Sequence, residues 1–462
     1  MEKRERLGSR LGFILLSAGC AIGCGNVWKF PWMAGENGGG VFVLLYAICL
    51  VLLGLPVMTM EFSLGRAAQA SPVKMYQKLQ KKGQKWHIHG YAALAGNVCL
   101  MAFYTVVSGW ILYYFWQFLS GGYTGMGFDY MAANPGADYT GLGFSGMIAD
   151  PMINMVTMAI VVVLGFLVVS FKLQGGLERI TKYMMVALLG LMVVLVGNSF
   201  LLEKAGEGLK FYLLPDLSKI SLEMVVAAMN QAFFTLSLGI GCMAIFGSYI
   251  GKERSLLGES VNVILLDTFV AVMAGLIIFP ACATYGLKVD DGPGLLFNTM
   301  GVVFHEMAGG QIWGTVFFLF MVFAAMSTIL AVFENILACV REMTGWSRPK
   351  ASVICAIGIF ALSTTTALGY NLIKFQPFAA RTAFLDLWDF IVSTNLLPLG
   401  SLAIVGFCCY KRYGWGWDNF MAEANTGKGL KVKNWMKPLF CYVVPAIVLA
   451  LYIIGLVTFS WN

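Results

Sequence analysis

Two apolar stretches of membrane length in this chain carry glycine-rich interruptions near their middle. The first spans 12–33 and contains Gly19-Cys20-Ala21-Ile22-Gly23-Cys24-Gly25-Asn26, and the second spans 225–249 and contains Ser237-Leu238-Gly239-Ile240-Gly241. A bilayer core has no water for backbone groups that leave a helix, so non-helical backbone is tolerated there only beside protein or an aqueous cavity. The interruptions therefore predict an internal binding site. The alternative is that the glycines only allow close helix packing.

Apolar runs that can cross a hydrocarbon core of about 30 Å recur along the whole chain. Of the 462 residues, 59% are hydrophobic and 12% are charged. We therefore predict an all-α polytopic membrane protein with a single membrane domain over residues 1–462. Eleven transmembrane helices are expected, at 12–33, 41–63, 90–119, 151–171, 180–202, 225–249, 256–285, 312–340, 351–368, 384–410 and 438–459.

The distribution of basic residues predicts the orientation in the membrane. With a cytoplasmic N-terminus, 24 of the 31 Lys and Arg residues fall in or beside cytoplasmic segments, as the positive-inside rule requires. The odd number of spans then places the C-terminus outside the cell. The net charge of +7 is explained by this topology, so no nucleic-acid partner is expected. The lipid bilayer of the cell (plasma) membrane is the expected surrounding.

The chain shows no signature of a metalloenzyme or an ATP-driven protein. Its eleven cysteines lie in or beside apolar spans, and no Cys-x-x-Cys pair is present, so they are interpreted as apolar filler. His87, His89 and His305 form no His-Glu-x-x-His motif, and no phosphate-binding Gly-x-x-x-x-Gly-Lys-Ser/Thr loop occurs. We predict that the chain is not an enzyme.

The two interrupted spans are the first and the sixth, so they are five spans apart. Interrupted helices at corresponding places in two halves indicate an inverted-repeat secondary transporter, which binds substrate and ions near the membrane midplane. The prediction is an inverted repeat of two five-helix halves with broken helices 1 and 6. The first half covers about 10–202, the second covers about 223–411, and an additional helix follows at about 438–459.

Longer motifs around these breaks resemble the neurotransmitter:sodium symporter family. They are Gly23-Cys24-Gly25-Asn26-Val27-Trp28-Lys29-Phe30-Pro31, Gln231-Ala232-Phe233-Phe234-Thr235-Leu236-Ser237-Leu238-Gly239 and Gly292-Pro293-Gly294-Leu295-Leu296-Phe297. The likeness is to bacterial amino-acid symporters such as the bacterial leucine transporter, including the eleven-span members that lack the twelfth helix. It implies a sodium-coupled symporter that imports neutral hydrophobic amino acids, aliphatic or aromatic, by alternating access. An amino-acid-binding membrane sensor or channel with the same fold is the alternative.

The resemblance implies two Na⁺ sites. The first would use Ala21, Asn26, Thr235 and Asp267, and the second Gly19, Ile22, Ala324, Ser327 and Thr328. Asp267 also stands out by itself, because a carboxylate within a span costs about 2.5–3.5 kcal/mol on insertion scales. Mammalian relatives have asparagine there and bind chloride nearby. The hypothesis is that Asp267 supplies this negative charge, so chloride is not required, and the alternative is a protonated side chain bonded to a neighbouring helix.

An amino-acid substrate suits the polarity of the first break, because the helix that begins there presents free N–H groups to a carboxylate. By resemblance, Tyr104 would donate to that carboxylate. The expected substrate-binding residues are Ala21, Gly23, Gly25, Leu100, Tyr104, Val107, Phe234, Ser237, Ile240, Thr328 and Val332. Because most of these are apolar, a neutral hydrophobic side chain is favoured over a charged one.

The resemblance also implies gates on both sides of the site. Lys29 and Asp389 match the outer charged pair, while Arg4 with Glu342, together with Tyr249, match the cytoplasmic latch. Glu61 is expected to accept hydrogen bonds from backbone freed at one of the two breaks. The sequence does not define the oligomeric state.

Overall fold

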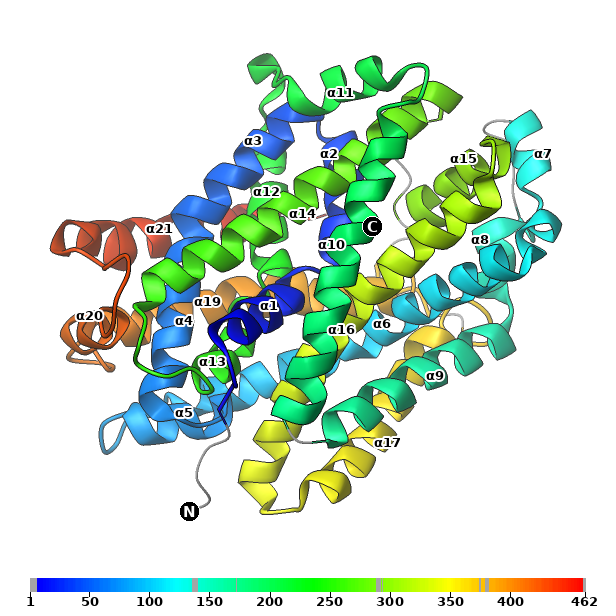
Figure 1. Ribbon diagram of the computed structural model, residues 1–462. Coiled ribbons are helices and arrows are strands. Elements are labelled where there is room, and N and C mark those ends of the chain that lie inside the picture. The colour runs from blue at the N-terminus through cyan, green and yellow to red at the C-terminus, as the bar shows by residue number, and fades with distance from the viewer. Residues whose placement is uncertain are drawn as a thin grey trace.

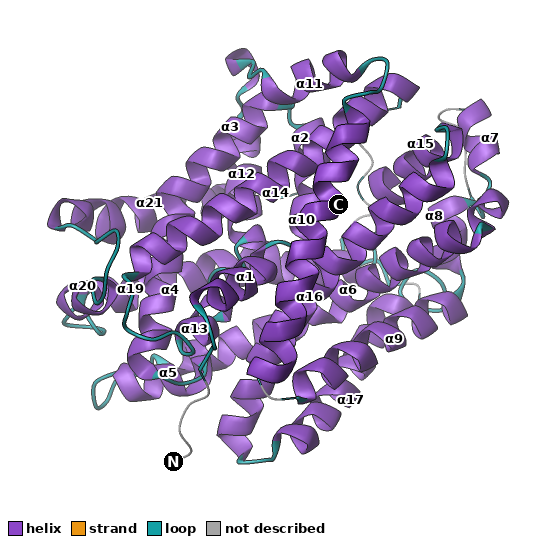
Figure 2. Ribbon diagram, in the orientation of Figure 1, coloured by secondary structure: helices purple, strands orange, loops and turns teal. Residues whose placement is uncertain are grey.

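The structure is a computed structural model that describes residues 6–134, 140–171, 173–287, 292, 294–373, 375–378 and 382–459. Within these residues the regular structure is helical, apart from an isolated β-bridge between Arg254 and Lys428. Figure 2 shows this bundle of helices joined by loops. The predicted all-α fold class is therefore confirmed.

The helices fall into membrane-length spans and short connecting helices, in which η marks a 3₁₀ or π segment. The spans are α1 (Arg10–Ala21), η1 (Gly25–Lys29) and α2 (Phe30–Glu36); α3 (Gly40–Cys49), η2 (Leu50–Gly54) and α4 (Leu55–Ala68); α6 (His87–Ser120); α9 (Pro151–Ser170); η4 (Gln174–Glu178) and α10 (Arg179–Ser199); α12 (Leu222–Thr235) and α13 (Cys242–Gly247); α14 (Leu256–Tyr285); α16 (Gly310–Thr344); α17 (Arg348–Ala367); α18 (Phe384–Asp389), η7 (Phe390–Leu396) and α19 (Leu397–Cys409); η9 (Leu439–Val443) and α21 (Val444–Val457). The connecting helices are α5 (Pro72–Leu79), η3 (Gly122–Met126), α7 (Phe128–Ala133), α8 (Gly143–Ala149), α11 (Ala205–Leu213), η5 (Leu217–Lys219), η6 (Leu295–Thr299), α15 (Met300–Glu306), α20 (Trp417–Ala424) and η8 (Asn434–Met436).

Helix starts in the described chain follow from local sequence. The Ser9 hydroxyl accepts a 2.9 Å hydrogen bond from the Gly12 N–H and caps α1. The Asp150 carboxylate caps α9 by accepting from the N–H groups of Met152 and Ile153, at 2.8 and 3.1 Å. Such side chains satisfy the N–H groups that a first helical turn leaves without intrahelical partners. Residue choice at the membrane boundary thus sets where these spans begin.

Within the described residues, nine helices are long and apolar enough to cross a membrane. A tenth span is the bent pair of Arg10–Ala21 and Gly25–Glu36, whose two parts meet at 54°. The break predicted in span 225–249 is present, because this span is divided into α12 and α13 with Leu236–Gly241 non-helical between them. Neither piece is long enough to cross alone, so the count of eleven stays a prediction.

The broken spans occupy the middle of the bundle. Figure 1 shows α1, α2, α12 and α13 surrounded by α3, α4, α6, α14 and α16. In particular, α1 packs against α10, α13, α14 and α16, while α12 packs against α3 and η1. This arrangement places both helix breaks where protein surrounds them, as freed backbone groups require. The division into two inverted halves and the sidedness of the termini stay predictions.

Candidate functional site

The break in the first span is short. Helix α1 ends at Ala21, Ile22 has extended backbone angles (φ −75°, ψ 96°), and a π-helical turn resumes at Gly25. Space here requires glycine, because a Cβ atom at Gly23 would lie 2.2 Å from the Tyr104 hydroxyl and 2.3 Å from the Thr328 hydroxyl. The glycine-rich sequence therefore lets the main chain approach two polar side chains closely.

The break in the sixth span is wider and more strained. Three of its residues, Ser237, Gly239 and Gly241, have positive φ angles of 49°, 87° and 78°. Positive φ is unfavourable for a non-glycine residue such as Ser237 and persists only where the surroundings impose it. The Gly241 N–H donates a 2.7 Å hydrogen bond to Glu61, a fully buried carboxyl group on α4. The expected role of Glu61 is therefore confirmed at the sixth-span break.

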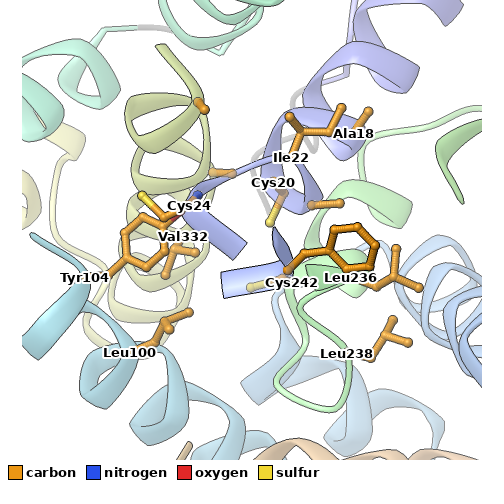
Figure 3. Close-up of a cluster of buried hydrophobic side chains, with 14 of the residues drawn as sticks. Ala18, Cys20, Ile22, Cys24, Leu100, Tyr104, Leu236, Leu238, Cys242 and Val332 are labelled. Carbon is orange, nitrogen blue, oxygen red and sulfur yellow. The ribbon is translucent and has the colours of Figure 1, made fainter. Parts of the chain in front are cut away.

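A pocket lies where the two breaks meet. It has about 240 Å³ of atom-free space when the space open to solvent is included, and it is lined by Cys20, Ala21, Gly23, Gly25, Leu100, Tyr104, Phe234, Thr235, Ser237 and Thr328. Among these lining residues none has a formally charged side chain. Figure 3 shows the surroundings, with Leu100, Tyr104 and Val332 on one side of the first-span break. The structure thus brings together eight of the eleven predicted substrate-binding residues.

The other three predicted substrate residues, Val107, Ile240 and Val332, are buried but are not among the lining residues. Ile240 contributes its carbonyl oxygen to a 2.7 Å hydrogen bond from the buried Asn97 side chain. Cys20 lines the pocket although the sequence analysis assigned it to packing. Asn97 was missed as well, and the signal for it is an amide side chain in an otherwise apolar stretch of α6.

Oxygen and nitrogen atoms of the predicted first sodium site form one buried network. The Thr235 hydroxyl lies 2.7 Å from Asn26 Oδ1 and 3.0 Å from Asp267 Oδ1. Asn26 Nδ2 donates to Asp267 Oδ1 at 2.8 Å, and the Tyr46 hydroxyl donates to Asp267 Oδ2 at 3.2 Å. Ala21 lines the adjoining pocket. The oxygen atoms among them are hard donors of the kind that Na⁺ prefers, gathered at the Asp267 side chain.

The predicted second sodium site also gathers its oxygen atoms, between α1 and α16. The Ser327 hydroxyl lies 3.2 Å from the Ile22 carbonyl oxygen and 2.9 Å from that of Ala324. The Thr328 hydroxyl lies 3.2 Å from the Gly19 carbonyl oxygen and 3.4 Å from that of Ile22. Carbonyl and hydroxyl oxygens at an unwound helix end can replace the water shell of a cation. Neither predicted site includes Cys20, whose carbonyl oxygen also contacts Thr328 at 3.2 Å.

On the side of the pocket toward α2, the predicted charged pair is present. Lys29 Nζ lies 3.0 Å from both carboxylate oxygens of Asp389. The same ammonium group lies 4.3 Å from the centre of the Phe234 ring, which lines the pocket. The ion pair therefore rests on an aromatic lid, with a cation–π contact between the two layers.

At the opposite end, a buried ionic network closes the bundle. The Tyr249 hydroxyl donates to Glu334 at 2.8 Å, and Arg348 contacts the same carboxylate. Arg4 lies outside the described residues, so its pairing with Glu342 stays a prediction. Glu342 accepts from the N–H and hydroxyl groups of Ser71, at 3.0 and 2.8 Å. The structure places Glu334 at the centre of this network.

Further polar contacts link the loops and short helices that are predicted to be cytoplasmic. Arg66, whose side chain is fully buried, pairs with Glu423 of α20 at 2.7 Å. Its guanidinium also donates to the carbonyl oxygen of Arg254 at 2.7 Å. A buried guanidinium requires such partners, because an unpaired charge in the interior is costly. The sequence alone did not single out Arg66 for this role.

A membrane bundle in which two broken spans enclose a pocket, with oxygen clusters beside it, defines a secondary transporter. Comparison with known proteins agrees. A model of the sodium:neurotransmitter symporter family matches residues 4–124 and 138–462. The uncharacterized sodium-dependent transporter YhdH of Bacillus subtilis is 32% identical over 464 residues, covering 99% of each chain. An uncharacterized sodium-dependent transporter of Haemophilus influenzae is 31% identical over 98% of this chain and 99% of its own.

A solved structure resembles the whole fold. The crystal structure of MhsT in complex with L-phenylalanine matches with a TM-score of 0.86 and 33% identity, covering 98% of this chain and 99% of that one. The chain therefore belongs to the sodium:neurotransmitter symporter family. It is a multi-pass membrane protein and a sodium-coupled transporter, not an enzyme.

Proposed function

We propose that this transporter imports neutral amino acids with aliphatic or aromatic side chains, together with sodium, by alternating access. The observation that carries the proposal is the polarity of the central pocket. Main chain from both breaks and the Tyr104 hydroxyl give its wall polar groups, and Leu100 and Phe234 give it apolar surface. A zwitterionic head group fits these polar groups, and a hydrocarbon side chain fits the apolar surface.

The absence of a formal charge among the described lining residues favours a neutral side chain, because burying an unpaired charge is costly. The substrate carboxylate would meet the helix that begins after the first break, where N–H groups and the helix dipole favour an anion. Its amino group would meet main-chain oxygens near Phe234 and Ser237. The L-phenylalanine in the MhsT structure is a molecule of this class and supports the proposal.

Two sodium ions would bind with the substrate. The first would lie among Ala21, Asn26, Thr235 and Asp267, and the second among Gly19, Ile22, Ala324, Ser327 and Thr328. Support comes from the hydrogen-bond contacts that already bring most of these oxygen donors together. The buried Asp267 carboxylate supplies the negative charge that would otherwise come from chloride, so transport would not require chloride.

Closure on the two sides would use different contacts. Lys29, Asp389 and Phe234 would close the extracellular side, and Tyr249 with Glu342 and Arg4 would close the cytoplasmic side. This assignment rests on the cytoplasmic N-terminus and extracellular C-terminus that the basic residues predict. The protein would accordingly lie in the cell membrane.

Uptake into proteoliposomes tests the proposal. With an inward sodium gradient, we expect saturable accumulation of labelled phenylalanine or leucine, and none of lysine or glutamate. Replacing sodium by potassium should abolish accumulation. Binding of amino acids without accumulation would instead indicate a sensor, and a sodium current uncoupled from substrate would indicate a channel. Thermal stabilisation by each amino acid in sodium and in potassium would identify the preferred substrate, because a ligand of the folded state raises stability.

A further inference from the structure

A second hollow lies about one helical turn along α6 and α16 from the central pocket. It contains about 290 Å³ of atom-free space, including its open mouth. Its lining residues are Ser108 and Leu112 of α6, Val161 and Leu164 of α9, and Val322, Ala325 and Met326 of α16. These three helices pack against one another, and Figure 1 shows α9 beside α6 near the edge of the bundle. We call this hollow the α6/α9/α16 crevice.

The crevice offers almost no polar group to a ligand. Ser108 is the polar residue among its lining residues, and its hydroxyl already donates a 2.7 Å hydrogen bond to the Tyr104 carbonyl oxygen. The other lining side chains are hydrocarbon or thioether. A charged or strongly polar ligand would therefore lose its hydration without gaining partners. The chemistry of the crevice selects an apolar occupant.

The mouth of the crevice faces the hydrocarbon of the bilayer. Leu164 is 46% exposed, and its neighbours on α9, Val163 and Leu167, are 62% and 53% exposed. Apolar side chains exposed to this extent on a membrane-length helix contact lipid. Leu164 lies within α9, and Val322 lies near the middle of α16, away from both helix ends. The crevice is thus continuous with the lipid-facing surface, at a depth where acyl chains are the available apolar molecules.

We propose that the α6/α9/α16 crevice binds one acyl chain of a membrane phospholipid. A flexible chain of methylene groups can follow a narrow apolar crevice, while its head group stays at the membrane surface. The favourable term is van der Waals packing, because hydrophobic transfer contributes little between lipid and an apolar protein surface. Unfilled space would leave the lining atoms without contact partners on one side.

The position gives this site a connection to transport. Tyr104 and Thr328 reach the central pocket from α6 and α16, and Ser108 and Ala325 line the crevice from adjacent turns of the same two helices. An acyl chain would therefore act as a spacer between two helices that form walls of the pocket.

Photo-crosslinking tests the inference without measuring transport, so its result is independent of the proposed function. The full-length protein is reconstituted with a phospholipid that carries a diazirine in its acyl chain, illuminated, digested and mapped by mass spectrometry. We expect adducts at Val322 and Met326 in excess of those at Val163. Leu164→Trp should cover the mouth and abolish these adducts. Leu167→Trp, a matched change at an exposed leucine on the same helix, should keep them.

Labelling spread evenly over the exposed residues of α9 would indicate annular lipid only and would overturn the inference. Equal labelling of Val322 and Met326 in Leu164→Trp and in the parent protein would overturn it as well. Should Leu164→Trp fail to give a monodisperse protein, Val161→Phe fills the crevice from its inner wall. The same loss of adducts is expected in that variant, and retained adducts would again contradict the proposal.

Discussion

The Gly241 amide and the Glu61 carboxyl group are joined by a 2.7 Å hydrogen bond between two helices that are far apart in sequence. The bond satisfies a main-chain donor that the sixth-span break removes from helical pairing. Leaving such a buried donor unpaired costs about 1–3 kcal/mol. The acceptor on α4 therefore stabilises the broken conformation of a different span.

Glu61→Ala should lower the thermal unfolding midpoint of the purified protein, by an amount that corresponds to about 1–3 kcal/mol. Glu61→Gln should retain most of the stability, because its amide oxygen still accepts from Gly241. Ser63→Ala, at a buried residue of the same helix, is the control and should have a smaller effect. Equal destabilisation by the Gln and Ala variants would mean that the hydrogen bond accepted from Gly241 does not stabilise the fold.

Asp267→Asn should make uptake dependent on chloride. The carboxylate is fully buried and lies against Asn26, Thr235 and Tyr46, so its replacement removes the negative charge of the first predicted sodium site. Uptake by the parent protein should be equal in chloride and gluconate media, while the variant should transport only in chloride. A parent protein that itself loses uptake in gluconate would contradict the assignment.

Ser327→Ala should weaken sodium binding without preventing folding. The hydroxyl is one of the oxygen atoms gathered at the second predicted sodium site. A hydrogen-bond-sized contact to a charged group contributes about 1.5–3 kcal/mol, so the half-saturating sodium concentration should rise at least about tenfold. Ser363→Ala removes a buried hydroxyl that lies against Thr105 and should leave sodium dependence unchanged. An unaltered sodium dependence in Ser327→Ala would exclude this residue as a ligand.

Gly23→Ala should abolish substrate binding. Its Cβ atom would lie 2.2 Å from the Tyr104 hydroxyl and 2.3 Å from the Thr328 hydroxyl, whereas a Cβ atom at Gly190 of α10 would meet no atom within 4 Å. Gly190→Ala is therefore the matched control and should bind normally. The measurement is sodium-dependent thermal stabilisation by the preferred amino acid. Normal stabilisation of Gly23→Ala would show that the first-span break lies outside the binding site.

Lys29→Ala should affect transport more than stability. The Lys29 and Asp389 side chains are 15% and 33% exposed, and ion pairs of this kind contribute about 0.2–1 kcal/mol. The thermal unfolding midpoint should hardly change. The uptake rate should fall, because the closure above the Phe234 ring loses the Lys29–Asp389 ion pair. Lys29→Arg should keep uptake near that of the parent protein, because a guanidinium can bind both carboxylate oxygens of Asp389. Lys219→Ala, at a more exposed pair with Asp216, should leave uptake unaltered.

The positions of the breaks could be predicted because their causes are local. Glycine clusters within apolar runs mark where a membrane helix must open, and Gly23 and Gly241 do lie at the two breaks. The width of the sixth-span break was not predictable, because the positive φ of Ser237 depends on the packing around it. No sequence pattern marks a serine that adopts this conformation.

The site residues likewise fall into those that could be predicted from the sequence and those that could not. Asn26, Thr235 and Asp267 are polar residues in apolar helices, so their convergence could be anticipated from the need for partners. The positions of Val107 and Ile240 could not, because a small rotation of a helix decides whether an apolar side chain reaches the pocket or the core. The pairing of Arg66 with Glu423 could not be predicted either, because α4 and α20 lie far apart in the sequence and meet only in the folded structure.

The segments α1 and α13, one from each broken span, have unequal lengths, since α1 has 12 residues and α13 has 6. At a rise of about 1.5 Å per residue, they measure about 18 Å and about 9 Å. Pivoting by the same angle at its break, the tip of α1 would sweep an arc about twice as long as the tip of α13. The amino-terminal arm is therefore the longer lever, and a small change of angle beside Gly23 would produce the larger excursion at its far end.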